Sequence, residues 1–133
     1  MIVLDNDVAV KLLREDDPGV KSHLNQYSSE VWAIPSLVSF EFFQHYHRLD
    51  VASQTQQQLL RVFDEILPFT DDVAVEAWRL NDQLLSQEII LDKLDLLNLA
   101  IAHEAGATFV THNSNDFDKT PIHQLTDIDV IVS

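Results

Sequence analysis

The chain opens with Ile2-Val3-Leu4-Asp5-Asn6-Asp7-Val8, in which a short apolar run is followed at once by a polar turn. Leu12 and Leu13 continue the apolar positions at helical spacing, to an end near Arg14. This stretch predicts a strand, a turn and a helix. Chains that alternate strands and helices in this way usually form a parallel sheet with helices on both faces.

The same alternation continues along the chain. Asp17-Pro18, Pro35-Ser36, Ser53 and Thr70 are typical helix starts, and Gly106 suits the left-handed position after a helix. We expect later strands at 31–34, 66–69, 108–111 and 129–132, a loop at 113–126, and later helices near 18–27, 36–49, 53–65, 71–85 and 92–105. The prediction is one α/β domain over 1–133: a three-layer α/β/α sandwich with a mostly parallel sheet of four or five strands.

The amino-acid composition limits which kinds of chemical site the chain can form. The 133 residues are 46% apolar, which suits one core, and they contain no cysteine, so thiolate metal sites and disulfides are excluded. No apolar run approaches the roughly 18 residues that a membrane helix needs, and an acid at position 5 is foreign to a signal peptide. We therefore expect a cytoplasmic protein without a membrane partner.

The net charge of −14 arises from 22 acidic and 8 basic residues. Such a charge repels polyanions at long range unless metal ions or salt intervene. The same excess is typical of proteins that work in molar salt, where surface acids maintain solubility. A halophilic source is therefore a hypothesis, and the charge alone does not exclude nucleic acid as a substrate.

Four acids are expected at one edge of the sheet. Asp5 directly follows the first strand, and Asp116 lies shortly after the strand at 108–111. Glu41 falls in the second turn of the helix after the second strand, and Asp95 in the first turn of its own helix. Because ligands of parallel sheets gather at the carboxyl ends of the strands, these carboxylates can converge there.

Carboxylates without Cys or an obvious His partner suit Mg²⁺ or Mn²⁺, which prefer oxygen ligands. One or two such ions could share the four acids and promote hydrolysis of a phosphodiester bond. Each acid also has a structural interpretation. Asp5 or Asp7 could cap the first helix, which we favour for Asp7 but not for Asp5; Asp95 could interact with a helix dipole, and Asp116 could belong to an ordinary turn.

Two further sequence patterns are weaker indications of a functional site. Glu41 and His45 are spaced as i and i+4, but no second metal-binding pair accompanies them, so a zinc site is not expected. Phe40, Phe43 and Tyr46 have few basic neighbours, which favours a core or dimer surface over a platform for stacking bases.

Four segments together resemble the PIN domain, and within it the VapC toxin branch. They are Ile2-Val3-Leu4-Asp5-Asn6-Asp7-Val8, Pro35-Ser36-Leu37-Val38-Ser39-Phe40-Glu41, the helix from Asp95 to Gly106-Ala107-Thr108, and Thr111-His112-Asn113-Ser114-Asn115-Asp116-Phe117. Each motif alone is common, but their order and spacing cover essentially the whole chain.

The resemblance implies RNA hydrolysis with Mg²⁺ or Mn²⁺, homodimerisation, and inhibition by a cognate antitoxin whose tail occupies the acidic pocket. It implies that the metal is bound by Asp5, Glu41, Asp95 and Asp116, with support from Asn6, Asp7, Thr111 and Asn113. The chain departs from the family pattern at three positions: Asn98 stands where an aliphatic residue is usual, His112 where a basic one is common, and Asp7 where Asn or Ser is usual.

Three alternatives stay open. Asp5-x-Asp7-Val8 after an apolar strand also resembles the nucleophile motif of haloacid dehalogenase phosphatases, although a convincing downstream lysine and Gly-Asp pair are missing. A phosphoaspartate receiver domain lacks its acceptor Asp after a middle strand. The non-enzymatic alternative is an inactive PIN module that only binds a partner, which retention of all four acids argues against.

Overall fold

The computed structural model describes residues 1–132, so Ser133, the last residue of the expected domain, lies outside the described residues. Five short strands form one sheet: β1 (Ile2–Leu4), β2 (Trp32–Pro35), β3 (Glu65–Leu67), β4 (Thr108–Thr111) and β5 (Ile128–Val130). Their order is β3-β2-β1-β4-β5, and every neighbouring pair is parallel. The expected parallel α/β sheet is confirmed, with five strands.

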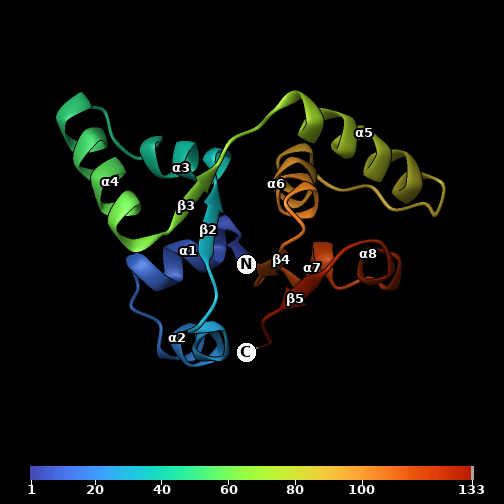
Figure 1. The fold of residues 1–133 in the computed structure, drawn as a ribbon, viewed down its shortest axis with the longest axis horizontal. Coiled ribbons are helices and arrows are strands. Elements are labelled where there is room, and N and C mark those ends of the chain that lie inside the picture. The colour runs from blue at the N-terminus through green and yellow to red at the C-terminus, as the bar shows by residue number, and fades with distance from the viewer. Residues whose placement is uncertain (133) are drawn as a thin grey trace.

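The helices divide into two groups, one on each face of the sheet (Figure 1). The first group is α1 (Asn6–Leu13), α2 (Pro18–Leu24), α3 (Ser36–Phe43) and α4 (Leu49–Val62), with a 3₁₀ turn at Asn25–Tyr27 after α2. The second is α5 (Asp71–Leu85), α6 (Lys93–Glu104), α7 (Ser114–Phe117) and α8 (Thr120–Leu125). The molecule is therefore a three-layer α/β/α sandwich, as predicted.

Alternating side chains of the strands build two cores. Val3, Ala33 and Phe109 pack with the second group of helices, whereas Ile2, Ile34 and Val110 pack with the first. All six are fully buried. The alternation follows from the period of two along a strand, and a sheet covered on both faces needs apolar residues at every position.

Several helix ends match the sequence signals. Asp17 Oδ1 accepts from the N–H groups of Gly19 and Val20, and Thr70 Oγ1 accepts from the N–H of Val73. Gly106 follows α6 with φ of +67°, the left-handed conformation in which a glycine carries no steric penalty. These three predictions are confirmed.

The helix predicted over 36–49 is wrong in length. It ends at Phe43, and its buried face carries Val38 and Phe42, while Phe40 is 55% exposed. The spacing of Phe40, Phe42 and Phe43 is compatible with two apolar faces, and packing in the fold buries the face that carries Phe42. The next helix begins at Leu49 rather than after Ser53, with an Arg48–Asp50 ion pair (Nη2–Oδ2, 2.7 Å) at its first turn.

The segment 113–126 was expected to be a loop and instead contains α7 and α8. Asn113 Oδ1 accepts from the Asp116 N–H and so caps α7, and Pro121 lies in the first turn of α8. Because polar residues typical of turns dominate this segment, its sequence did not indicate either helix. Phe117 and Ile122 are fully buried, which anchors the two helices to the sheet.

No helix within residues 1–132 is both long and apolar enough to cross a bilayer.

Candidate acidic active site

The order in which the strands are added to the sheet reverses direction at β1, the central strand. From β1 the chain proceeds outward to β2 and β3, and then returns to the other side of β1 to form β4 and β5. Parallel sheets bind ligands at such a switch point, outside the carboxyl ends of the two central strands. Asp5 follows β1 and His112 follows β4, so both lie at this position.

Asp5 is the N-cap of α1 and is 5% exposed. Its Oδ1 accepts from the Asn6 N–H at 2.8 Å, and its Oδ2 accepts from Thr111 Oγ1 at 2.8 Å. Both donors are uncharged. Burial and the neighbouring Asp7 carboxylate therefore raise the pKa of Asp5 to about 7, despite these two hydrogen bonds.

Asp7 lies in the first turn of α1 and links this helix to the segment after β4. Its Oδ1 accepts from the Val8 N–H at 2.7 Å, and its Oδ2 accepts from the His112 N–H at 3.2 Å. Burial raises its pKa. The preference for Asp7 as the cap was wrong, because the structure gives that position to Asp5.

A chain of hydrogen bonds connects Asp5 to Asp116. Thr111 Oγ1, which donates to Asp5, accepts from the Asn113 N–H at 3.1 Å. Asn113 Nδ2 in turn donates to Asp116 Oδ2 at 2.8 Å. Thr111 and Asn113 thus hold two of the predicted acids in fixed relative positions.

The other two acids come from helices on opposite faces of the sheet, Glu41 from α3 and Asp95 from α6. Burial, then the carboxylates of Asp116 and Asp92, raise the pKa of Asp95 to about 6. Burial also raises the pKa of Glu41, and the neighbouring Asn98 amide partly offsets this rise. Each acid lies in the electrostatic field of at least one other.

These groups surround one small pocket with a volume of about 140 Å³. Its lining residues are Asp5, Asn6, Asp7, Glu41, Asp95, Asn98 and Asn113. The structure therefore brings together three of the four predicted acids and three of the four predicted supporting residues. Asp116 and Thr111 are not part of the lining but are hydrogen-bonded to two of its residues, Asn113 and Asp5 respectively.

The donor set suits a hydrated divalent cation. Within residues 1–132, no three His, Cys, Asp or Glu side chains stand in a ready-made metal site. Mg²⁺ commonly takes only one or two protein carboxylates and keeps several waters, so it does not require such a closed cage. The buried Glu41 Oε1 atom has no hydrogen-bond partner among the described residues, which leaves an acceptor for a cation or its water. The residues thus fit the cation.

Asn98 was noted only as a departure from the family pattern, yet it is 1% exposed and lines the pocket. The available signal was its place in an apolar run, Leu96–Ala102, where an amide must have a specific role. His45, in contrast, lies beyond the end of α3, so the i and i+4 pair with Glu41 is not on one helix.

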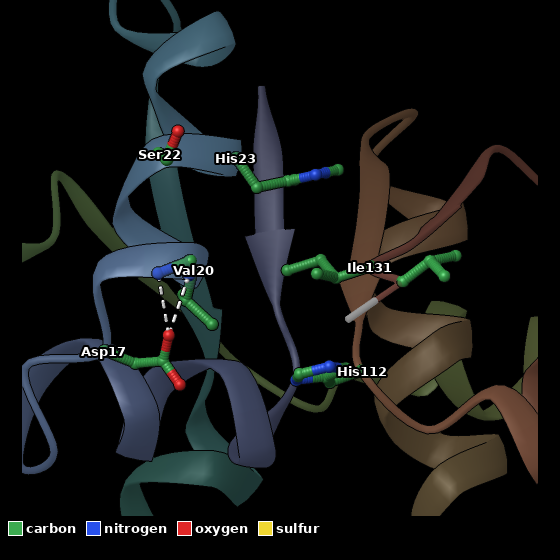
Figure 2. Close-up of a pocket in the computed structure, with 8 residues that line it drawn as sticks. Asp17, Val20, Ser22, His23, His112 and Ile131 are labelled. Atoms are coloured by element: carbon green, nitrogen blue, oxygen red, sulfur yellow. Dashed lines mark hydrogen bonds between the residues drawn. The ribbon is translucent and has the colours of Figure 1, made fainter.

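A second pocket, of about 370 Å³, lies between α2 and the segment after β5 (Figure 2). In the close-up, Asp17, Val20, Ser22 and His23 come from the α2 side and face His112 and Ile131 across the opening. Among the described residues of its lining, Asp17 carries the one carboxylate, and this carboxylate caps α2. This pocket therefore lacks the convergent acids of the first.

Fold and site together define a class of protein: a doubly covered parallel α/β domain with an acidic pocket at the switch point of its sheet. The PIN domain family matches residues 2–122, and the chain belongs to this family. That membership replaces the haloacid dehalogenase and receiver alternatives. A comparison with curated protein sequences finds no match.

Solved structures share the fold at low sequence identity. VapBC2 of Rickettsia felis, bound to a DNA fragment from its promoter, has a TM-score of 0.76 and 20% identity, covering 98% of each chain. VapBC-1 of nontypeable Haemophilus influenzae has a TM-score of 0.78 and 15% identity, covering 100% of each chain. A toxin-antitoxin complex from Klebsiella pneumoniae has a TM-score of 0.73 and 19% identity, covering 100% of this chain and 99% of the other.

Proposed function

We propose that the chain is an endoribonuclease that hydrolyses RNA phosphodiester bonds at the acidic pocket and depends on Mg²⁺ or Mn²⁺. The observation that carries the proposal is the convergence of Asp5, Glu41 and Asp95 on one pocket without a lysine or arginine in its lining. Carboxylates so placed raise one another's pKa, and a divalent cation relieves that repulsion.

In this proposal Asp5, Glu41, Asp95 and Asp116 hold the cation, directly or through water. A bound divalent cation lowers the pKa of a water molecule and neutralises charge that develops on the phosphoryl oxygens. Thr111 and Asn113 hold Asp5 and Asp116 in place through the hydrogen bonds described above. Asp7 keeps the segment after β4 against α1, and Asn6 lines the pocket beside Asp5.

An acidic pocket must still admit a polyanion. Lys11 Nζ lies 2.6 Å from His112 Nδ1, and the His112 N–H donates to Asp7. This places a positive charge at the margin of the pocket, where an RNA phosphate could approach. The chain has only eight basic residues, so Lys11 is a specific candidate for such a contact.

We further propose that the chain is the toxin of a VapBC-type pair, acts in the cytoplasm as a homodimer, and is inhibited by an antitoxin. The fold neighbours support this proposal, because they include VapBC proteins and a toxin-antitoxin complex. Inhibition would follow if an antitoxin segment covers the acidic pocket, since RNA and cation enter there.

The test is cleavage of a cellular RNA pool by the purified chain in Mg²⁺, Mn²⁺ or EDTA. We expect cutting in either metal and none in EDTA. Asp5→Asn should remove the activity, whereas Asp72→Asn, which removes an equal charge at an exposed position on α5, should retain it. If the chain neither binds metal nor cuts RNA, the alternative of a partner-binding PIN module replaces the nuclease proposal.

A further inference from the structure

Asn98 occupies an unusual position for an amide. It lies one turn after Asp95 on α6, between Leu96 and Leu99, and is 1% exposed. A buried amide in an apolar stretch is costly unless its donors and acceptor are paired. The side chain faces the acidic pocket rather than the apolar core, because it belongs to the pocket lining.

Two buried oxygen atoms at this place lack a donor in the described part of the chain. They are Oδ1 of Asn98 and Oε1 of Glu41. Asn98 and Glu41 line the same pocket, and the Asn98 amide lowers the pKa of the Glu41 carboxyl against the larger effect of burial. Native structures rarely leave buried acceptors unpaired, and a pair of them beside several carboxylates indicates a site for a cation or its water.

We propose that Asn98 is a positioning residue of the acidic pocket, which holds the Glu41 carboxylate for a divalent cation. The inference rests on the proposed function and deepens it, since it assigns a role to a residue outside the four acids. The amide suits this role because it supports Glu41 without adding a fifth negative charge to the pocket.

The experiment measures the dissociation constant of Mn²⁺, used as the probe, in wild type, Asn98→Leu, Glu41→Gln and the double variant. Electron paramagnetic resonance of free Mn²⁺ reports binding without any RNA. Partners behind a metal ligand typically contribute 10- to 100-fold in affinity, so Asn98→Leu should weaken binding by roughly tenfold or more. In the Glu41→Gln background the same change should have a much smaller effect, because Asn98 acts through Glu41.

Melting in EDTA identifies a variant that has lost its fold, and Asn98→Ala then takes the place of Asn98→Leu. Unchanged Mn²⁺ affinity in a folded Asn98 variant would overturn the inference, as would an equal loss in both backgrounds. Either result leaves the nuclease proposal standing. Conversely, wild type that binds Mn²⁺ with the expected coupling but cuts no RNA contradicts the nuclease proposal and retains the role of Asn98.

Discussion

Asp5 combines a structural and a chemical position. As the N-cap of α1 it accepts from the Asn6 N–H, and as a pocket residue it is buried beside Asp7. A carboxylate in such surroundings favours the fold when it is protonated and opposes it when it is ionised. Function and stability therefore conflict at this residue.

Without metal, Asp5→Asn should stabilise the protein at high pH. Since the pKa of Asp5 is about 7 when folded and 3.8 for the unperturbed side chain, wild type loses stability as pH rises from about 4 to 7. Each pKa unit corresponds to about 1.4 kcal/mol, so a gain of roughly 2 kcal/mol or more is expected at pH 8. Urea unfolding in EDTA at pH 3.5 and 8 measures it.

The gain should nearly vanish at pH 3.5, where Asp5 is protonated in the folded state and mostly protonated in the unfolded state. The control Asp72→Asn, at an exposed position, should give no such gain at pH 8. An Asp5→Asn protein that is less stable than wild type at pH 8 would contradict the raised pKa.

Thr111→Val should reduce cleavage at least tenfold with a modest effect on folding. The valine retains the shape of the side chain but neither donates to Asp5 nor accepts from the Asn113 N–H. Loss of such a buried hydrogen bond costs about 1–3 kcal/mol. Thr108→Val is the matched control, because Thr108 lies on the same strand and donates to Asp127 instead. Equal activities of the two variants would remove Thr111 from the site.

At the scale of elements, α7 carries Asp116 on a helix of only four residues. Two contacts hold it: the Asn113 cap and the packing of Phe117 against Phe109, with ring centroids 5.4 Å apart. Because so short a helix has little stability of its own, the position of Asp116 depends on these contacts.

Phe117→Ala should therefore affect both stability and activity. Removal of a fully buried phenylalanine typically costs about 3–5 kcal/mol, and here it also releases α7. Urea unfolding and RNA cleavage measure the two losses. Phe40→Ala, at an exposed position on α3, should change the free energy of unfolding little. A Phe117→Ala protein of wild-type stability would show that α7 is held by other means.

The elements differ in how far they could be predicted from the sequence. The existence of the five strands and the helix caps at Asp17 and Thr70 depends on local sequence, and these predictions are confirmed. The orientation of α3 could not be resolved, since Phe40, Phe42 and Phe43 fit two faces equally and only packing selects one. The helices at 114–125 were missed because turn residues dominate their composition.

The candidate site also contains residues that the sequence predicts and residues that it does not. Asp5, Glu41 and Asp95 were expected to converge because the topology of a parallel sheet brings them to one edge, and all three line the pocket. Asn98 was not assigned to the site, because no spacing rule distinguishes a pocket amide from a core amide. Its burial and its unpaired oxygen are tertiary properties, which appear only once α3 and α6 are placed together.

At the scale of the whole molecule, the charge of −14 dominates the surface. Self-repulsion of a compact chain weakens as salt screens it, and the Debye length falls from about 10 Å at 0.1 M to about 3 Å at 1 M. A protein with this composition should therefore gain stability in salt.

We expect the melting temperature in EDTA at pH 8 to rise steadily with KCl up to 2 M. A gain of 1 kcal/mol corresponds to roughly 4 °C for a chain of this size. The same titration near pH 4.4, where the net charge is close to zero, is the control and should show a much smaller rise. Indifference to KCl at pH 8 would contradict the halophilic hypothesis.

The most direct test of the central claim, that one acidic pocket binds the cation and cuts RNA, is to titrate Mn²⁺ while measuring cleavage rate and metal occupancy on the same protein. The rate should follow occupancy, and Asp5→Asn should lose both the binding and the cleavage while remaining folded. Cleavage that persists in Asp5→Asn, or in wild type without bound metal, would contradict the assignment of this pocket as the active site.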